Sequence, residues 1–167
     1  MCNDFKNRPS NDYEPFLHQA LNQSIGTRFD QVLRRFPNKL AVHTKRYSWT
    51  YAELNTRADQ IAQLINERTL SRRAPILLLF EHDAPAIAAV LGVLKAGHFY
   101  CALDPSAPLE KNRTIRQSLR PRALLCDRAN LDSSEKIAEA MIPVLNAEDT
   151  PLKATGGALE IHVSPAA

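Results

Sequence analysis

The chain has 167 residues, 44% of them hydrophobic and 23% charged, and a formal net charge of +3. These values are typical of one globular domain of ordinary size. The small net charge, with basic residues scattered along the chain, argues against a nucleic-acid-binding protein. The longest apolar run, residues 84–94, is too short to cross a bilayer, and the N-terminus lacks the pattern of a secretory signal. We therefore expect no membrane association and a cytoplasmic location.

The N-terminal part of the chain is expected to change from a polar lead-in to a folded domain. Residues 1–24 are polar and rich in Asn, which predicts a poorly ordered segment, and residues 25–167 are expected to form the domain. Thr27 is interpreted as the N-cap of a helix that Pro37 ends. The helix has apolar residues at the spacing i, i+3, i+4 and i+7, namely Phe29, Val32, Leu33 and Phe36.

A hairpin and a second helix are predicted next. Two short apolar runs, residues 40–43 and 47–49, lie on either side of a polar turn and predict the hairpin. Thr50 and Glu53 have the spacing of a capping box, in which each side chain bonds the backbone amide of the other residue. Glu53 and Arg57 are expected to form an i,i+4 ion pair. The buried face of the helix is expected to hold Leu54, Ala58, Ile61, Ala62 and Ile65.

The most apolar part of the chain predicts a strand, a helix and a second strand. Residues 75–80, PILLLF, form a run that is typical of a central parallel strand. Every residue of 84–94 is apolar or Gly, which predicts a helix that is buried all round. Lys95 lies in its last turn, where a cation offsets the helix dipole, and Gly97 ends the helix. Residues 99–103 are expected to form a buried strand.

The remaining sequence continues the alternation of helix and strand. A helix that begins at Ser106 or Pro108 is expected to end at Leu119, with Leu109, Ile115 and Leu119 facing inward. The later predicted elements are a strand at 123–126, a helix at 133–141, a strand at 144–145 and a strand at 159–163. This order predicts an α/β fold with a mostly parallel sheet and helices on both faces.

One glycine-containing segment comes close to a phosphate-binding pattern. The segment GVLKAGH, residues 92–98, approaches GxxxxGK[ST]. It departs from that pattern because His98 and Phe99 replace Lys and Ser or Thr, and because the segment lies late in a predicted helix. Gly156-Gly157 lacks the surrounding pattern altogether. We interpret these glycines as structural and expect no phosphate site.

Three neighbouring polar residues, Glu81-His82-Asp83, follow the predicted strand at the edge where α/β proteins bind ligands. Neighbours in sequence rarely converge on one point, and Asp83 is better placed as the N-cap of the next helix. The five histidines show no metal-ligand spacing, and Cys101 and Cys126 are expected to be buried thiols. These patterns identify no catalytic, cofactor-binding or metal-binding residue.

Two segments resemble the first two core motifs of the adenylation domains of nonribosomal peptide synthetases. Residues 49–54, WTYAEL, resemble L-[TS]-Y-x-E-L, with Trp49 in place of the usual Leu. Residues 94–105, LKAGHFYCALDP, resemble LKAGxAYxPLDP, with Phe99 in place of Ala and Ala102 in place of Pro. The two motifs occur in the family's order and at the family's separation.

The flanking segments agree with the same register. Residues 29–42 look like the helix and P-x-x-x-A-V opening of these domains, and residues 120–127 look like their x-P-x-x-L-L-T-D strand. The resemblance covers about residues 24–165 and implies the N-terminal part of the large subdomain of an adenylate-forming enzyme. Complete members of this family use ATP and Mg²⁺ to activate an amino or carboxylic acid, and they pass the acyl group to a phosphopantetheine thiol.

The resemblance implies scaffold rather than catalysis for this chain. The family's phosphate loop and the lysine of its C-terminal subdomain are not among the 167 residues, so we expect a truncated domain that is inactive alone and binds no cofactor. Two alternatives stay open, a non-catalytic docking or binding module and one half of a split acyl-adenylate-forming ligase. The expected partners are the remaining adenylation subdomains or carrier-protein modules. The acid substrate is not specified.

Overall fold

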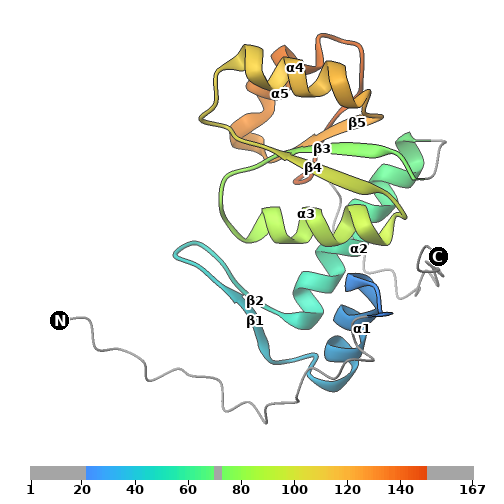
Figure 1. The fold of residues 1–167 in the computed structure, drawn as a ribbon. Coiled ribbons are helices and arrows are strands. Elements are labelled where there is room, and N and C mark those ends of the chain that lie inside the picture. Colours follow the sequence, from blue (N-terminus) through green and yellow to red (C-terminus); the bar gives the residue numbers. More distant parts are fainter. Residues whose placement is uncertain (1–21, 70–72, 150–167) are drawn as a thin grey trace.

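The computed structural model describes residues 22–69 and 73–149. Its elements form a central sheet with helices above and below it and a hairpin beside one helix layer (Figure 1). Residues 1–21 of the predicted lead-in, the strand at 159–163 and Gly156-Gly157 lie outside the described residues. The division of the chain into residues 1–24 and 25–167 therefore stays a prediction.

The first helix, α1, spans Ile25–Arg35, and its N-cap is Ser24. The Ser24 hydroxyl oxygen accepts a hydrogen bond from the amide of Thr27 at 3.1 Å. The prediction that Thr27 is the cap was wrong by three residues, because Thr27 supplies the amide that is capped. The helix ends at the C-cap Phe36, directly before Pro37, as expected.

The predicted hairpin is confirmed. Strands β1 (Leu40–His43) and β2 (Ser48–Thr50) pair in antiparallel fashion, with Val42 opposite Trp49. In the turn, the Thr44 hydroxyl oxygen accepts hydrogen bonds from two amides that follow it, at 3.2 and 3.0 Å. A threonine in this position fixes a turn in the way that an Asx residue does.

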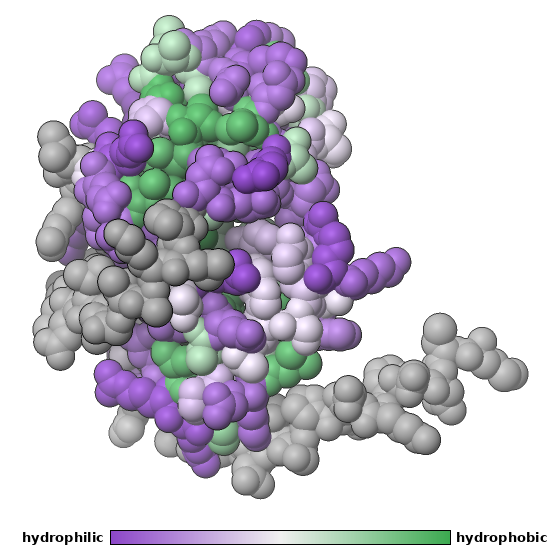
Figure 2. Space-filling model, turned by 180° about the vertical axis from the view of Figure 1, so that it is seen from behind, coloured by the Kyte–Doolittle hydropathy of each residue, from purple (hydrophilic) through white to green (hydrophobic). Residues whose placement is uncertain are grey.

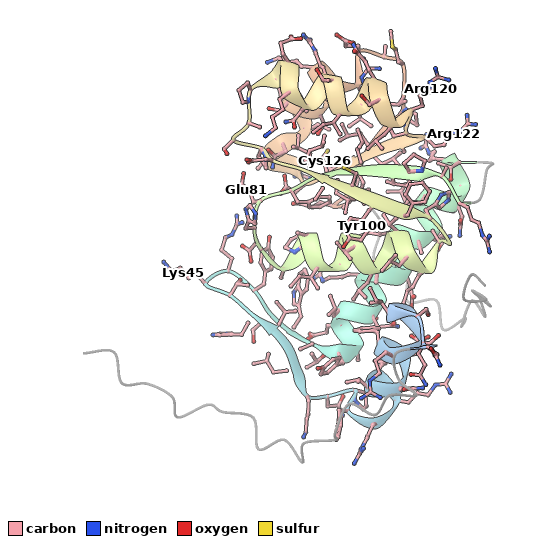
Figure 3. The ribbon with its side chains drawn as sticks, viewed as in Figure 1. Lys45, Glu81, Tyr100, Arg120, Arg122 and Cys126 are labelled. Carbon is pink, nitrogen blue, oxygen red and sulfur yellow. The ribbon has the colours of Figure 1, made fainter. Side chains whose placement is uncertain are left out.

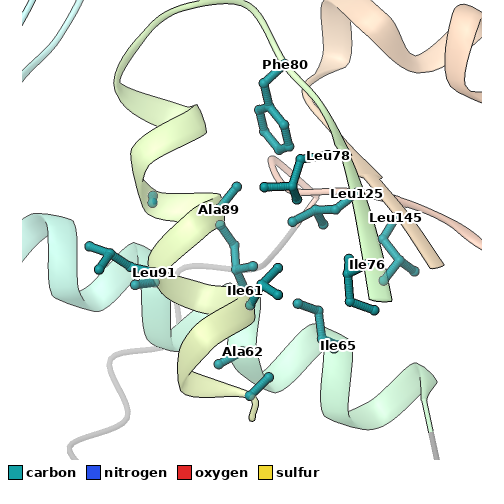
Figure 4. Packing of buried hydrophobic residues seen from close by; sticks show 14 of the residues in the cluster. Ile61, Ala62, Ile65, Ile76, Leu78, Phe80, Ala89, Leu91, Leu125 and Leu145 are labelled. Carbon is teal, nitrogen blue, oxygen red and sulfur yellow. The ribbon is translucent and has the colours of Figure 1, made fainter. Parts of the chain in front are cut away.

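Helices α2 (Tyr51–Arg68) and α3 (Ala84–Lys95) pack against each other and against one face of the sheet (Figure 1). The five residues expected on the buried face of α2 are all buried. Figure 4 shows apolar side chains of both helices meeting those of the strands: Ile61, Ala62, Ile65, Ala89, Ile76, Leu78 and Leu125. This is the larger of two apolar clusters in the described residues.

The sheet has the predicted parallel strands. Its members are β3 (Pro75–Leu79), β4 (Phe99–Leu103), β5 (Ala123–Cys126) and β6 (Val144–Asn146). Their spatial order is β4-β3-β5-β6, and every neighbouring pair is parallel. In the register, Ile76 lies between Tyr100 on one side and Ala123 on the other. The predicted α/β fold with helices on both faces is confirmed.

Helices α4 (Leu109–Leu119) and α5 (Leu131–Ala138) cover the opposite face of the sheet (Figure 1). A smaller apolar cluster lies beneath them, formed by Leu77, Leu79, Leu103, Leu124, Cys126 and Ile137. Helix α5 lies two residues earlier at its start than predicted, because a short 3₁₀ turn at Arg128–Asn130 leads directly into it. It ends at the C-cap Glu139, whose backbone is left-handed at φ 51°.

The predicted strand at residues 99–103 is confirmed, but the prediction that it is buried was wrong. Strand β4 lies at the edge of the sheet, and the side chains of Phe99 and Tyr100 are 51% and 40% exposed. Cys101 is half-buried instead of buried, whereas Cys126 on the interior strand β5 is fully buried as expected. An edge strand has a neighbour on one side only, so even an apolar sequence stays open to solvent there.

Two further apolar residues are more exposed than expected. Ile87 in α3 is 43% exposed, so α3 is buried over most of its surface and not all round. Leu119, the last residue of α4, is 38% exposed and does not face inward, whereas Leu109 and Ile115 contact the smaller apolar cluster as predicted. Leu119 is exposed at the point where the helix ends, next to the C-cap Arg120, whose backbone is left-handed.

Candidate functional site

The carboxyl ends of the four parallel strands share one edge of the sheet, and this edge is the candidate site. From β3 the chain first forms β4 on one side of it and then β5 and β6 on the other side. The strand order therefore reverses between β3 and β5, which makes this the topological switch point. Open α/β sheets bind ligands outside the carboxyl ends of their strands at such a point. Figure 3 shows Glu81 at this edge, on the side of the hairpin tip at Lys45 and opposite Arg120 and Arg122.

The predicted group Glu81-His82-Asp83 lies at this edge but does not converge. Glu81 and His82 are exposed, whereas Asp83 is the N-cap of α3 and accepts from the Ala84 amide at 2.8 Å. Asp83 also forms an ion pair with Arg46 of the hairpin, at 2.6 Å. A hydrogen bond from the Thr44 hydroxyl, together with the Ala84 and Arg46 contacts, lowers the pKa of Asp83. The N-cap prediction is confirmed, and Asp83 acts as a structural anion.

Asp127 is the buried polar residue of the switch point, and the sequence analysis missed it. Its carboxylate accepts from the Glu81 amide at 2.8 Å, which ties the end of β3 to the end of β5. It also accepts from the backbone amide and the side-chain amide of Asn130, at 3.0 and 2.7 Å. An Asp directly after a buried strand and three residues before Asn was the available signal. With these bonds made, Asp127 fixes the loops of the edge.

A third acidic residue, Asp104, follows β4. One of its carboxylate oxygens accepts from the Ser106 amide at 2.8 Å and from the Ser106 hydroxyl at 2.7 Å. These bonds, the hydroxyl first, lower the pKa of Asp104. The arrangement is an Asx turn, which explains how the Asp-Pro pair ends the strand. The three aspartates at this edge therefore have structural hydrogen bonds, in contrast to the exposed side chain of Glu81.

Residues 49–54, which resemble the first core motif, contain the predicted capping box. The Glu53 carboxylate accepts from the Thr50 amide at 2.8 Å, and the Thr50 hydroxyl oxygen accepts from the Glu53 amide at 3.3 Å. Hydrogen bonds from the Thr50 amide and hydroxyl lower the pKa of Glu53. The charge of Arg57 also lowers the pKa of Glu53, as the expected i,i+4 pairing implies, but the Arg57 guanidinium lies over the Trp49 ring, 4.3 Å from its centroid, and forms no close ion pair with Glu53.

Lys95, in the second motif-like segment, has a larger role than dipole compensation. Its ammonium donates to the side-chain oxygens of Asn55 at 2.6 Å and Asp59 at 2.7 Å, both on α2. Asp30 of α1 lies 3.8 Å away. The lysine therefore ties three helices together at the end of α3. The spacing of Asn55 and Asp59, one turn apart, was the sequence signal that went unused.

Both glycines of the phosphate-loop-like segment are structural, as expected. A Cβ atom at Gly92 would lie 2.6 Å from the Ile61 side chain and 2.9 Å from the Ala58 carbonyl oxygen, so α2 and α3 can pack this closely only with glycine. Gly97 has φ +78°, a left-handed backbone that ends α3. Gly92 lies inside α3, where its amide is used within the helix.

The histidines and cysteines do not form a reactive centre within the described part of the chain. No group of three or more His, Cys, Asp or Glu side chains over residues 22–69 and 73–149 could hold a metal ion. His98 is buried, and burial lowers its pKa. Burial raises the pKa of the Cys126 thiol to about 11, which makes it a poor nucleophile at neutral pH.

Sequence comparison identifies the relatives of this fold. The family model described as AMP-binding enzyme matches residues 29–162. Malpinin synthetase of Mortierella alpina is 31% identical over 121 residues, which cover 72% of this chain and 2% of the relative. Bacitracin synthase 1 of Bacillus licheniformis is 28% identical over 127 residues, 76% of this chain and 2% of the relative. The chain thus spans about 2% of the length of these curated relatives.

Solved structures agree with these relatives. The nonribosomal peptide synthetase FmoA3, bound to alpha-methyl-L-serine-AMP, matches with a TM-score of 0.71 and 26% identity over 78% of this chain and 14% of its own. The four-domain synthetase AB3403, bound to AMP and glycine, has the same fold, with a TM-score of 0.70 and 20% identity over 79% of this chain and 10% of its own. No helix over residues 22–69 and 73–149 has the length and hydropathy of a membrane span. The chain belongs to the AMP-binding enzyme family and corresponds to the N-terminal part of a nonribosomal peptide synthetase adenylation domain.

Proposed function

We propose that this chain is a structural part of an amino-acid-activating domain and that its 167 residues do not form an acyl-adenylate by themselves. The observation that carries the proposal is the use of both core-motif segments for packing. Thr50 and Glu53 cap α2, and Lys95 ties α3 to two other helices. Side chains that are saturated with such contacts stabilise a scaffold, and they are not available to a substrate.

The three aspartates at the sheet edge do not fit a site for ATP and Mg²⁺. Mg²⁺ requires oxygen ligands that are free to coordinate, but Asp83, Asp104 and Asp127 each accept hydrogen bonds from their own loops. We therefore assign binding of these groups to other parts of a complete domain. A cytoplasmic location, where such a synthetase would work, is part of the same proposal.

The amino acid class of the substrate and the partners are also proposed from the relatives. FmoA3 and AB3403 were solved with an aminoacyl adenylate and with glycine and AMP, respectively, which supports an amino acid as the activated acid. The partners would be the remaining adenylation subdomains and carrier-protein modules. Two features support such partners: the outer edges of β4 and β6 are unpaired among the described residues, and apolar surface gathers in the half of the molecule that holds the sheet (Figure 2).

A segment exchange tests the scaffold role. Residues 29–149 would replace the matching segment of the adenylation domain of bacitracin synthase 1. We expect the chimera to retain ATP–pyrophosphate exchange with the amino acid preference of the recipient, and the 167-residue chain alone to show no exchange with any amino acid. A folded chimera without exchange, or exchange by the chain alone, would contradict the proposal.

A split enzyme is the second candidate, and the two unpaired sheet edges among the described residues favour it over an isolated docking module. Addition of the separately expressed remainder of the recipient domain to the 167-residue chain distinguishes the two. Exchange activity that appears only on mixing supports the split enzyme. Binding without activity supports the docking module.

A further inference from the structure

A cavity of about 270 Å³ adjoins the sheet edge described above, on the side of α2 and α3. It opens to solvent and is lined by β2, by the middle of α2, by the start of α3 and by the residues that follow β6. Its apolar wall is formed by Ile61, Pro85 and Ala88. Cavities of this size that combine an apolar wall with a few polar groups are typical binding sites for small molecules.

Two hydrogen-bond donors line this cavity from one face of α2. Gln60 Nε2 is buried and has no acceptor among the described residues. Arg57 lies one turn earlier on the same helix, and its guanidinium is stacked on Trp49 at 4.3 Å. Buried polar groups in folded proteins nearly always have a partner. An unbonded amide beside a guanidinium therefore indicates that an acceptor belongs in this space.

The charge of the cavity favours an anion with one negative charge. Within residues 22–69 and 73–149, Arg57 contacts the Trp49 ring and attracts Glu53 at longer range, but it forms no ion pair within 4 Å. The other charged lining residue, Glu148, lies 3.8 Å from the Arg128 guanidinium, so its charge is partly balanced outside the cavity. The unbalanced charge is therefore positive. The Glu148 carboxylate would still repel a dianion such as phosphate.

We propose that this cavity binds a small monocarboxylate with an apolar body. The carboxylate accepts from Arg57 and from Gln60 Nε2, and the apolar body contacts Ile61, Pro85 and Ala88. A planar guanidinium held by an aromatic ring is preorganised for a carboxylate, which reduces the entropy lost on binding. The site depends on Trp49, the residue at which this chain departs from the family's first motif, and it does not depend on the proposed adenylation role.

Calorimetric titration of the full 167-residue chain with phenylacetate tests the proposal. We expect saturable binding of phenylacetate, at least tenfold weaker binding of the uncharged analogue 2-phenylethanol, and no binding of inorganic phosphate. Absence of saturable phenylacetate binding would overturn the proposal. Equal affinity for phenylacetate and 2-phenylethanol would also overturn it, because the donors would then contribute nothing.

Two substitutions test the donors separately. Gln60→Glu keeps the shape of the side chain and replaces the donor by a carboxylate, and Arg57→Met removes the guanidinium. Each is expected to weaken phenylacetate binding at least tenfold, about the loss that follows from one hydrogen bond to a charged group. The matched controls Gln63→Glu and Arg68→Met change exposed residues of the same helix and should leave the affinity unchanged. Unchanged affinity in a folded Gln60→Glu variant, verified by circular dichroism, would contradict the assignment.

Discussion

The two helix pairs that cover the faces of the sheet are held together by different kinds of contact. On one face, α2 and α3 approach so closely at Gly92 and Ile61 that a single methyl group would clash, and the surrounding cluster is apolar. On the other face, the buried Arg116 of α4 pairs with Glu139 at the end of α5, at 2.5 Å. The first interface therefore depends on shape, and the second depends on charge.

This difference predicts different responses to substitution and to salt. A shape-dependent interface should tolerate no added volume and should be indifferent to ionic strength. A charge-dependent interface should lose stability when one partner is removed, and it should weaken as salt screens the partly exposed carboxylate. The four predictions below address these two interfaces and the groups at their margins, from the largest expected effect to the smallest.

Gly92→Ala should produce the largest loss, because the new Cβ atom would lie 2.6 Å from the Ile61 side chain and 2.9 Å from a backbone oxygen of α2. We expect a loss of about 3 kcal/mol in the free energy of unfolding, measured with urea. Gly26→Ala is the matched control, since its Cβ would meet only the Ser24 hydroxyl at 3.8 Å. Because Ala is a better helix former than Gly, this control should stabilise the chain slightly. A similar loss in both variants would mean that the contact between α2 and α3 does not cause the loss.

Arg116→Met should weaken the opposite face by about 2 kcal/mol, because it removes a buried cation and leaves the partly exposed Glu139 without that partner. The loss should be smaller in about 1 M NaCl, where the wild-type pair is itself weakened. Arg120→Met, at the exposed C-cap of the same helix, is the control and should change stability little. If the Arg116→Met loss is independent of salt, the contact between α4 and α5 is one of packing.

Lys95→Met tests whether the polar tie at the margin of the α2–α3 interface adds to its shape complementarity. The substitution keeps the apolar stem and removes the bonds to Asn55 and Asp59, so we expect a loss of about 1.5 kcal/mol. Lys136→Met removes an exposed i,i+4 pair with Asp132 and should cost less than about 0.5 kcal/mol, the usual value of such a pair. Equal losses would mean that the Lys95 network contributes no more than a surface ion pair.

Local sequence patterns predicted the elements whose causes are local. The capping box, the hairpin, the buried face of α2 and the end of α3 at Gly97 follow from residues within a few positions of each other. The errors concern neighbours in space. The apolar sequence of β4 does not indicate that this strand lies at the edge of the sheet. The hydrogen-bond partners of Lys95 lie on α2, at least 36 residues away in the sequence.

The candidate site was predictable to the same extent. The position of Glu81-His82-Asp83 after β3 and the N-cap role of Asp83 could be predicted, because both depend on adjacent elements. The link from Asp127 to Glu81 could not, because it depends on β5 lying beside β3. The cavity beside Arg57 and Gln60 was also beyond prediction, since segments that are distant in sequence line it.

The smallest expected effect concerns the dependence of stability on pH. His98, which lies between α3 and β4, is buried, with Nδ1 within 3.3 Å of the Ala74 amide and Nε2 3.4 Å from the Thr69 hydroxyl. Burial lowers its pKa below the ordinary value of 6.5, so the unfolded chain binds this proton at a higher pH than the folded chain does. Stability is therefore fully present above about pH 6.5 and declines as the pH falls below it.

We expect the melting temperature to fall between about pH 7.5 and pH 5.5, and His98→Gln to reduce that fall because the variant has no proton to gain at this position. His82→Gln is the control, since His82 is exposed at the sheet edge and should leave the pH dependence unchanged. If His98→Gln and the wild type lose stability in parallel over this range, protonation of His98 does not cause the decline. The lowered pKa of Asp83 and Asp104 adds a separate loss of stability, which sets in only near and below about pH 4 as those carboxylates protonate.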